Sequence, residues 1–454
     1  MRLRVFCACL AARASRAVLR LLGRGGTALP GKVALRICPE LLAQLSRGVQ
    51  TVLITGTNGK TTTTRMLCAM YDGLGLSYFT NRSGANLASG LAATYLDNAT
   101  LTGRPKCARA VIECDEGALR QVSGRLHPAV IVVTNVFRDQ LDRYGEVTHT
   151  LGSIRAGILA APETVVCLNA DCSLTASLAG DVPTPVRFFG LNVPCEASAA
   201  GVSDAPRCIR CGGAYRYRYH TYAHLGGFYC PDCGYTRPEP DTAVTELTAL
   251  RPDGSTARFR CGDEEFSAEL SLPSVYNVCN AAAALCATGA LGLPVRRAAE
   301  TLGGVRAGFG RMEILPVGRH EARIILVKNP AGCDRALDYL ATIPGDFLPV
   351  FCLNDKTADG TDVSWVWDAD YERLIARGVI REALVYGTRA GDMRLRLKYA
   401  GLDDARIRCA ESLDALMQQM RQADKPVYLL PNYTALLEVR ERIAADSGSK
   451  KFWE

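Results

Sequence analysis

The segment Thr51-Val-Leu-Ile-Thr-Gly-Thr-Asn-Gly-Lys-Thr-Thr62 decides the fold of this chain. Its first five residues form a short apolar run of strand length, and the residues from Thr61 to Leu74 follow a helical pattern. A glycine loop between a strand and a helix is typical of phosphate-binding loops, because glycine lets the backbone wrap around phosphate oxygens. The N-terminus of the helix adds a fixed positive potential. The segment therefore predicts a nucleotide-binding α/β domain.

The residues of this loop have distinct predicted roles in binding ATP. Lys60 would neutralise charge on the β- and γ-phosphates, and the Thr61 hydroxyl would hold Mg²⁺. The full pattern G-x-x-x-x-G-K-[ST] is not met, since Ile54 occupies the first glycine position. The alternative is a chance Gly-Lys-Thr turn, against which the flanking strand and helix argue. We therefore predict that the residues binding ATP include Gly56, Thr57, Asn58, Gly59, Lys60, Thr61 and Thr62.

Two acidic segments follow later strands and are candidates for completing the magnesium site. Glu113-Cys-Asp-Glu116 lies at the carboxyl end of a predicted strand, where ligands bind in open α/β sheets. Mg²⁺ prefers one or two carboxylates together with phosphate oxygens and water. Glu113 is our first choice as a ligand. For Asp115, Asp139 and Asp142, the alternative role is a helix cap or a solvated charge.

Short apolar runs alternate with helical patterns along most of the chain. The runs at 110–113, 129–134 and 164–168 are rich in Val and Ile, as in strands buried on both faces of a parallel sheet. We expect an α/β fold with a doubly wound, largely parallel sheet in the ATP-binding domain, followed by a smaller Rossmann-like α/β domain. The expected boundaries are a helical lead-in over 1–45, the ATP-binding domain over 46–315 with an insert at about 205–240, and the last domain over 316–454.

The composition excludes several classes of protein. The chain has 454 residues, of which 48% are hydrophobic and 22% charged, so it is neither disordered nor fibrous. No apolar run approaches the roughly 18 residues that span a bilayer. The net charge of +7 suits an anionic substrate or a membrane surface, but it lacks the clustered basic face of a nucleic-acid binder. We therefore expect no nucleic-acid partner.

The chain has 19 cysteines and 5 histidines, and four of the cysteines are spaced as metal ligands. Cys208-Ile-Arg-Cys211 and Cys230-Pro-Asp-Cys233 form two C-x-x-C pairs separated by 18 residues, as in a zinc ribbon. Four thiolates close a tetrahedral sphere, so we predict a structural Zn²⁺. Disulfides or redox pairs are the alternatives, and His220 and His224 are spare ligands. The remaining cysteines are interpreted as buried or inert.

The first residues of the chain resemble a targeting peptide in composition only. Arginines at 13, 16, 20 and 24 interrupt the apolar residues at helical spacing, so there is no clean hydrophobic region. We expect an amphipathic helix that packs on the main domain, with contact to a membrane surface as the alternative. A cytoplasmic, reducing location follows, and a peripheral position at the inner face of the cytoplasmic membrane is left open.

Several motifs together resemble those of the Mur ligases, which add amino acids to peptidoglycan precursors. The loop at 54–63 resembles their ATP loop, and Asn135 with 139–145 is similar to their Asn…Asp-His-Leu-Asp-x-His-Gly segment. Residues 276–283 match their His-Asn-x-x-Asn-x-x-Ala segment, with Tyr in place of His, and residues 310–313 match their Gly-Arg-Met-Glu segment. The resemblance implies that ATP is also contacted by Asn277, Asn280 and Arg311.

Three departures from the Mur ligases resemble the MurT family, the ligase-like subunits of lipid II isoglutaminyl synthase. Only about 50 residues precede the ATP loop, too few for a Mur-type sugar-binding domain. The last domain opens with Leu326-Val-Lys-Asn-Pro-Ala-Gly332, and the four-cysteine insert is foreign to Mur ligases. This resemblance implies ATP-dependent amidation of the D-Glu α-carboxylate of lipid II to D-isoglutamine. The ammonia would come from a GatD-type glutamine amidotransferase partner.

The MurT resemblance also implies that this chain supplies the acid of the partner's Cys/His triad. We favour Asp362, with Asp359 and Asp355 as fallbacks; the alternative for Asp362 is a cap on a helix that starts near Ser364. Trp365 and the following Trp367 are candidates for interface anchors or for core packing. Two competing functions are kept: a stand-alone Mur-type or folylpolyglutamate-type amino-acid ligase, and a zinc-ribbon nucleic-acid ATPase.

Overall fold

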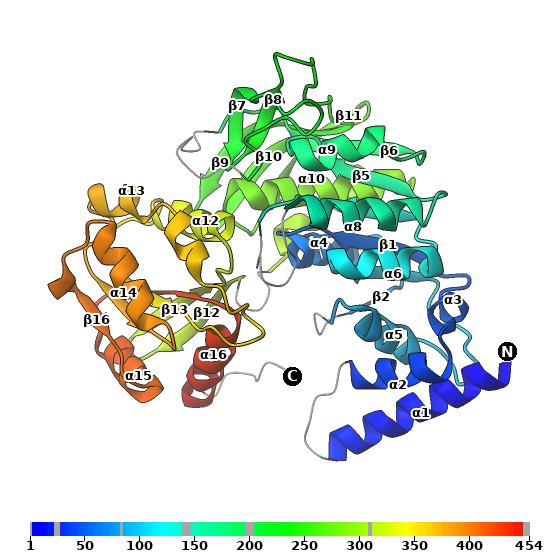
Figure 1. Cartoon of the computed structure of the whole chain (residues 1–454), viewed down its shortest axis with the longest axis horizontal. Helices are drawn as coiled ribbons and strands as arrows, with labels where there is room; N and C mark the ends of the chain where they lie inside the picture. Colours follow the sequence, from blue (N-terminus) through cyan, green and yellow to red (C-terminus); the bar gives the residue numbers. More distant parts are fainter. Residues whose placement is uncertain are drawn as a thin grey trace. The chain divides into compact units, whose positions relative to one another are not determined.

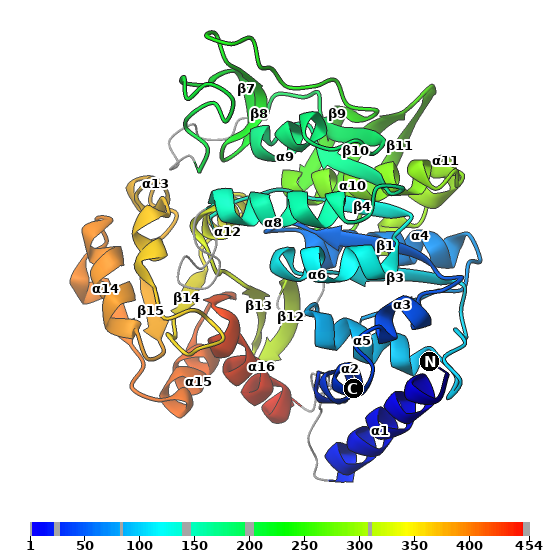
Figure 2. The ribbon, with the colours of Figure 1, turned by 45° about the vertical axis from the view of Figure 1, so that its right-hand side comes forward.

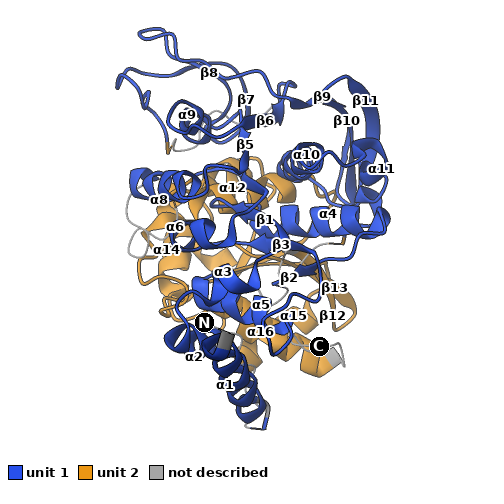
Figure 3. Ribbon diagram, turned by 90° about the vertical axis from the view of Figure 1, so that its right-hand side faces the viewer, with its two compact units in different colours: residues 1–136, 147–197, 205–305 blue, residues 137–146, 198–204, 306–454 orange. Residues whose placement is uncertain are grey.

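The computed structural model describes residues 2–21, 28–81, 85–138, 147–195, 204–306 and 311–447. The chain divides into two compact units (Figures 1 and 3). Unit 1 comprises 1–136, 147–197 and 205–305, and unit 2 comprises 137–146, 198–204 and 306–454.

Unit 1 is built on a nine-stranded sheet with the order β11-β10-β9-β6-β5-β4-β1-β3-β2. Neighbouring strands from β2 to β9 run parallel, and β9, β10 and β11 form an antiparallel meander. The strands are β1 (Gln50–Thr55), β2 (Phe79–Thr80), β3 (Arg109–Glu113), β4 (Val130–Val133), β5 (Val165–Asn169), β6 (Val186–Leu191), β9 (Thr242–Arg251), β10 (Gly254–Cys261) and β11 (Glu264–Leu270). All four residues of β4 are buried, as expected for a strand covered on both faces.

Helices cover both faces of this sheet (Figure 3). Helices α4 (Lys60–Gly73), α10 (Val275–Ala290) and α11 (Val295–Ala299) pack together on one side, and α6 (Glu116–Leu126) and α8 (Val147–Leu159) pack together on the other. The remaining elements of unit 1 are α1 (Arg2–Leu21), α2 (Leu29–Ile37), α3 (Leu41–Leu45), α5 (Ala88–Asp97), α9 (Ser173–Ser177), the 3₁₀ turns η1 (Leu178–Gly180) and η2 (Leu302–Gly304), and a separate hairpin of β7 (Arg216–Tyr222) and β8 (Leu225–Tyr229). The expected doubly wound, largely parallel sheet is confirmed.

The expected helical lead-in contains a second helix in its glycine- and proline-containing part, where α2 begins at Leu29. Pro30 lies in the first turn, where its missing N–H has no helical acceptor to lose. Gly31 then allows α2 to approach α5, since a Cβ at Gly31 would lie 1.9 Å from the carbonyl oxygen of Ser89.

Unit 2 contains a six-stranded sheet with the order β12-β13-β17-β14-β15-β16. Only the β12–β13 pair is antiparallel. The strands are β12 (Arg311–Val317), β13 (His320–Ile325), β14 (Leu348–Cys352), β15 (Ala383–Tyr386), β16 (Ile407–Cys409) and β17 (Val427–Pro431). The helices are α12 (Pro330–Leu340), α13 (Tyr371–Ala376), α14 (Ala390–Tyr399), α15 (Leu413–Gln422) and α16 (Tyr433–Ser447), with 3₁₀ turns η3 (Ser364–Asp368) and η4 (Asp404–Arg406).

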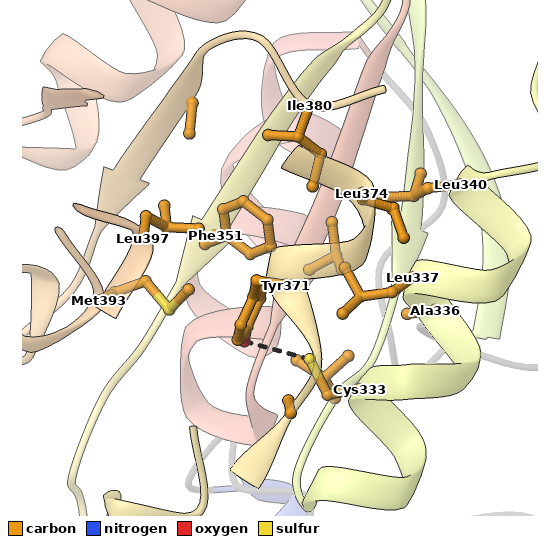
Figure 4. Packing of buried hydrophobic residues seen from close by; sticks show 14 of the residues in the cluster. Cys333, Ala336, Leu337, Leu340, Phe351, Tyr371, Leu374, Ile380, Met393 and Leu397 are labelled. Carbon is orange, nitrogen blue, oxygen red and sulfur yellow. Dashed lines mark hydrogen bonds between the residues drawn. The ribbon is translucent and has the colours of Figure 1, made fainter. Parts of the chain in front are cut away.

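The core of unit 2 lies on both faces of its sheet, because side chains alternate along each strand. In β14, Phe351 contributes to the cluster under α12, α13 and α14, whereas Val350 contributes to the cluster under α15 and α16. Figure 4 shows the first cluster, in which the Tyr371 hydroxyl lies 3.2 Å from the Cys333 thiol. Burial on both faces explains why these strands read as continuous apolar runs.

The boundary between the two domains remains a proposal. β12 starts before residue 315 and belongs to unit 2, so a boundary at 315 would cut through this strand. Because strands are rarely divided between domains that fold separately, we place the boundary between Val305 and Arg311.

Truncating Leu337 is expected to destabilise unit 2. The side chain is fully buried in the cluster of Figure 4, so Leu337→Ala should cost about 2–5 kcal/mol. The two described tryptophans, Trp365 and Trp367, lie in unit 2, so intrinsic tryptophan fluorescence during urea unfolding reports on this unit. The matched control is Leu395→Ala, in which the replaced side chain is 46% exposed and the expected change is within about 0.5 kcal/mol. Equal midpoints for both variants would contradict the assigned core.

Candidate nucleotide and metal sites

The glycine loop lies between β1 and α4 and is held by the residues that follow β4. Gly56 and Gly59 have φ angles of 116° and 89°, a region that favours glycine. The Thr57 N–H donates to the Asn135 carbonyl oxygen at 2.9 Å, and the Asn58 N–H donates to the Asn135 side-chain oxygen at 2.9 Å. The loop is therefore fixed in an open curve at the carboxyl edge of the sheet.

Close packing leaves no room for larger residues at the two glycines. A Cβ at Gly56 would lie 2.4 Å from the Thr134 hydroxyl oxygen, and a Cβ at Gly59 would lie 2.2 Å from the Asn280 side-chain oxygen. Asn280 comes from α10, as does Asn277, whose amide donates to the Pro273 carbonyl oxygen at 2.7 Å. The structure thus brings Asn280 to the loop from a segment more than 200 residues away.

Lys60 is buried and lies over the loop. Its ammonium group donates to the Gly56 carbonyl oxygen at 2.5 Å and to a Glu116 carboxylate oxygen at 3.1 Å. Both residues are buried, so the ion pair is well shielded from water. Glu116 lies in the quoted acidic segment, but no pattern in the sequence predicts that it pairs with Lys60.

Thr61 and Glu113 meet beside the lysine. The Thr61 hydroxyl donates to a Glu113 carboxylate oxygen at 2.7 Å, and the Asn86 amide donates to the other oxygen at 3.3 Å. The Glu113 backbone is paired in both directions with Asn81. A hydroxyl and a carboxylate within hydrogen-bond distance form the oxygen donor set that Mg²⁺ prefers. These residues fit the ion, and the remaining ligands would come from phosphate and water.

The other members of the acidic segment have different roles. Asp115 is the N-cap of α6, because its side chain accepts hydrogen bonds from the N–H groups of Gly117 and Ala118. This is the alternative that the sequence left open for Asp115. Burial raises the pKa of Cys114 well above its usual range, so the thiol stays protonated. Asp139 and Asp142 lie outside the described residues.

Two further predicted ATP contacts are less well defined. Thr62 is half-exposed in the first turn of α4. Arg311 begins β12 in unit 2, and its side chain lies outside the described part of the chain. Both contacts remain predictions.

The four cysteines of the insert converge on one point. Their sulfur atoms all lie within 4.8 Å of one another, with Cys208 3.6 Å from Cys233 and Cys211 3.5 Å from Cys230. The two knuckles share one geometry, since the N–H of Gly212 donates to the Cys208 carbonyl oxygen and the N–H of Gly234 donates to that of Cys230. Both glycines have positive φ angles, of 78° and 73°. Such a group could hold a metal ion.

Hydrogen bonds at Cys208 favour the thiolate form of this side chain, whereas the pKa of Cys211 in the same knuckle is raised. Burial opposes ionisation of Cys208, but N–H groups of Arg210 and Cys211 and the Cys233 side chain lower its pKa to about 7. Of the spare ligands, His220 stacks on the ring of Tyr217 at 4.2 Å, and His224 is buried with its Nε2 4.0 Å from the Cys172 sulfur. Among the described residues, the group that could hold a metal ion contains neither histidine.

The insert is anchored to the sheet of unit 1 by a buried ion pair. The Arg237 guanidinium donates to Asp171 at 2.7 Å, and the other Asp171 oxygen accepts the Leu191 N–H at 2.9 Å. On β7 the arginines at 216 and 218 are exposed, whereas the Tyr219 hydroxyl donates to the Leu191 carbonyl oxygen at 2.9 Å. The aromatic residues of β7 thus contribute to anchoring, which does not favour a nucleic-acid stacking surface.

The three candidate aspartates of unit 2 lie after β14, at the carboxyl edge of its sheet. Asp359 is buried and accepts hydrogen bonds from the Thr434 N–H, at 2.7 Å, and from the Thr434 hydroxyl. Asp355 accepts from the Thr388 hydroxyl at 2.8 Å and is paired with Arg389. Burial raises the pKa of Asp359, whereas the hydrogen bond from Thr388 lowers that of Asp355.

Asp362 is half-exposed, as is Asp355. One of its oxygens accepts the Ser364 N–H at 2.8 Å at the start of η3, which is the capping role left open by the sequence. Hydrogen bonds from Ser364 lower the pKa of Asp362, so it is ionised at neutral pH. Trp365 packs against the core, while Trp367 is 46% exposed with its ring 5.8 Å from that of Tyr399.

None of the described helices is both long and apolar enough to cross a membrane.

Comparisons with known proteins agree with this arrangement. The Mur ligase middle domain family matches residues 54–201, and the MurT ligase C-terminal family matches residues 326–436. In fold, the chain is similar to a pseudomurein peptide ligase type C from Methanothermus fervidus, with a TM-score of 0.67 and 21% identity over 88% of this chain and 79% of that one.

Two relatives match along nearly their whole length. The chain is 35% identical over 449 residues, covering 98% of each chain, to the lipid II isoglutaminyl synthase (glutamine-hydrolyzing) subunit MurT of Streptococcus pneumoniae. It is 32% identical over 436 residues to the subunit of the same name from Staphylococcus aureus, covering 96% of this chain and 95% of the relative. With both domain families present in this order, the chain belongs to the MurT family of Mur-ligase-like subunits.

Proposed function

We propose that this chain is the ATP-dependent subunit of a lipid II isoglutaminyl synthase and amidates the D-Glu α-carboxylate of the lipid II stem peptide. The observation that carries the proposal is 35% identity over 98% of both chains to a subunit with that activity in its name. The glycine loop, Lys60 and the Thr61–Glu113 pair support it, because they form one polar site at the carboxyl edge of the sheet.

The reaction divides into two transfers. A carboxylate oxygen attacks the γ-phosphorus of ATP, and ADP leaves to give an acyl phosphate. Ammonia then attacks the acyl carbon, phosphate leaves, and the nitrogen loses a proton to give the amide. Phosphorylation comes first because a carboxylate has no adequate leaving group, whereas an acyl phosphate releases phosphate.

The protein contributes charge and position rather than covalent chemistry. The α4 N-terminus and the N–H groups of the loop would face the phosphates, and Lys60 would move from Glu116 to the phosphate oxygens. Thr61 and Glu113 would hold Mg²⁺, which when bound neutralises phosphate charge. Asn277 and Asn280 would lie near the nucleotide beside Gly59.

Replacing Lys60 is expected to abolish the reaction. Lys60→Ala removes the positive charge from the phosphate site, so amidation of lipid II and release of ADP should each fall at least about 100-fold. The assay uses free ammonium, ATP and detergent-solubilised lipid II, so it does not depend on a partner. The control is Lys106→Ala, an exposed lysine bonded to the Asp97 carbonyl oxygen. Activity of Lys60→Ala near that of the control would refute the assignment.

The ammonium assay also separates the competing ligase function. A stand-alone amino-acid ligase would join a free amino acid to the substrate without a partner. The proposed function instead predicts product formation with ammonium and none with free amino acids.

We propose that a GatD-type glutamine amidotransferase supplies the ammonia and that Asp362 completes its catalytic triad. A triad acid must be ionised, reachable and oriented so that it can hold an imidazole. Asp362 meets these demands best, because Ser364 engages one of its oxygens and favours the charged form. Asp359 already accepts a hydrogen bond from Thr434, and Asp355 already accepts one from Thr388 and forms an ion pair with Arg389.

The surface near Asp362 offers anchors for such a partner. Trp367 and Tyr399 are 46% and 72% exposed, and Leu395 of the same helix as Tyr399 is 46% exposed. Exposed tryptophan and tyrosine side chains are enriched at interface hot spots. The Arg396 guanidinium lies 5.6 Å from the centre of the Trp367 ring and donates to the Val366 and Ala369 carbonyl oxygens, which fixes η3.

The aspartate variants should separate the two activities of the complex. Asp362→Asn is expected to reduce glutamine-dependent amidation by about 10⁴-fold, as loss of a triad acid does, while ammonium-dependent amidation stays within about twofold. Asp355→Asn is the matched control, with both activities near those of the wild type. Unchanged glutamine hydrolysis in Asp362→Asn would exclude this residue, and unchanged hydrolysis in Asp355→Asn, Asp359→Asn and Asp362→Asn would exclude the whole loop.

We propose that the four cysteines hold a structural Zn²⁺. Four thiolates leave no open position for a substrate, so the ion when bound would supply cross-linking of the two knuckles. The sulfur separations of about 3.5–3.6 Å within each near pair support a common centre. The insert would then act as a rigid scaffold, or as a docking element, fixed to the sheet through Arg237.

Loss of one exposed thiol should release the metal. Wild-type protein purified without chelators should carry one zinc per chain by elemental analysis, and Cys211→Ser should carry almost none. Cys409→Ser is the control, since Cys409 is also exposed but lies outside the group. Absence of zinc from the wild type, or its retention in Cys211→Ser, would overturn the assignment.

The proposed substrate also sets a location. Lipid II is a membrane lipid, so we propose that the chain works in the cytoplasm at the inner face of the membrane.

A further inference from the structure

Helix α1 has two apolar faces, and the described residues cover one of them. Val5, Ala8, Cys9 and Ala12 are buried, with exposures between 0% and 5%. They recur at the spacing of one helical face, and α1 packs on α2 in unit 1 (Figure 2). This face accounts for the expected packing of the helix on the main domain.

The second face is apolar and exposed. Leu3 is 75% exposed, Phe6 39%, Leu10 52% and Leu21 87%. At about 100° per residue these side chains lie on one stripe, roughly opposite the buried face. Ala14 and Ala17 fall between Leu10 and Leu21 on the same stripe, so no polar residue interrupts it. We call Leu3, Phe6, Leu10, Ala14, Ala17 and Leu21 the outer stripe.

Exposed apolar side chains are more concentrated on the outer stripe than on the rest of the described surface. Of the 16 large hydrophobic residues that are exposed in the described parts of the chain, five lie on α1, and four of these belong to the outer stripe. The other exposed residues are spread over many elements, which is normal for a protein surface. A contiguous stripe indicates a binding surface.

Charge decides what the outer stripe fits. The sequence of α1 contains five arginines and no acidic residue. By the helical period, Arg13 lies beside Phe6 at one border of the stripe, and Arg4 lies on the other side, about 80° beyond Ala14; both arginines are exposed. Arg13 also donates to the Ala99 carbonyl oxygen at 3.1 Å, and Arg16 is paired with Asp97. An apolar stripe bordered by arginines complements the acyl boundary and anionic headgroups of a phospholipid membrane.

We propose that the outer stripe of α1 docks on the surface of an anionic phospholipid membrane, with α1 lying in the interface. The apolar side chains would enter the acyl boundary, while the bordering arginines would reach phosphate groups with their charged ends. The helix rests on the membrane and does not cross it. This deepens the proposed function, because it would hold the site of unit 1 near a membrane-anchored substrate, but its evidence is α1 alone.

The test is sedimentation of the full chain with vesicles that contain no lipid II. The vesicles are equal parts phosphatidylglycerol and phosphatidylcholine, or phosphatidylcholine alone, at about 0.1 M ionic strength, where surface charge still acts over roughly 10 Å. The variant is Leu3→Gln/Leu10→Gln/Leu21→Gln, which changes only exposed side chains. The control is Leu159→Gln/Leu250→Gln/Leu395→Gln, at positions that are 43%, 48% and 46% exposed elsewhere.

The wild type and the control should bind the vesicles that contain phosphatidylglycerol equally. Both should partition about tenfold or more weakly onto vesicles of phosphatidylcholine alone, and the outer-stripe variant should partition about tenfold or more weakly than the wild type onto vesicles that contain phosphatidylglycerol. Equal binding by wild type and outer-stripe variant, or no binding by either, would overturn the proposal. A fall in molar mass of the outer-stripe variant by light scattering, with unchanged vesicle binding, would assign the stripe to a protein partner and also overturn it. The rate of amidation of detergent-solubilised lipid II should be unchanged in the outer-stripe variant. The membrane docking and the proposed reaction are therefore tested separately.

Discussion

The close approach of the loop after β1 to the backbone after β4 is the constraint on which the rest of unit 1 depends. The Thr57 N–H can donate to the Asn135 carbonyl oxygen at 2.9 Å because the adjacent Gly56 has no Cβ and therefore packs closely against Asn135. Gly59 packs closely against Asn280 for the same reason. This packing turns the loop amides and the α4 N-terminus outward at the sheet edge. It also brings Lys60 and Thr61 within hydrogen-bond distance of the acids at the end of β3 and the start of α6.

Local pattern predicted the parts of this site that are local. The strand–loop–helix order, Lys60 and Thr61 were readable because their positions follow from spacing alone. The Glu113 carboxylate could be proposed because parallel strands end at a common edge. The Lys60–Glu116 ion pair and the hydrogen bond from the Asn58 N–H to Asn135 could not be predicted from the sequence. Predicting either contact requires the register of separate strands and the direction of individual side chains. Asp115 shows the same limit, because a cap and a metal ligand have identical sequence signals.

The insert shows a similar division between local and distant interactions. Two C-x-x-C-Gly knuckles encode their own turns, so their convergence was predictable from spacing. Their attachment to the sheet was not predictable, because it depends on an ion pair between Arg237 and Asp171, two residues that are far apart in the sequence. Burial raises the pKa of Asp171, and the Arg237 charge and hydrogen bonds oppose this shift. Removing Arg237 alone would leave a carboxylate buried without its cation, which costs more than the pair contributes.

Helix α1 explains why periodicity alone could not decide between packing and membrane contact. A helical repeat of apolar residues signals a face to be covered, but it does not name what covers it. Here two such faces share one helix, and the fold covers only the face of Val5 and Ala12. The face of Leu3 and Leu10 keeps its exposed apolar area at a cost in solvation, with arginines rather than acids along its borders. An exposed face of this kind is stable in water only as part of a folded unit, and it lowers its free energy when a surface of matching polarity and opposite charge covers it.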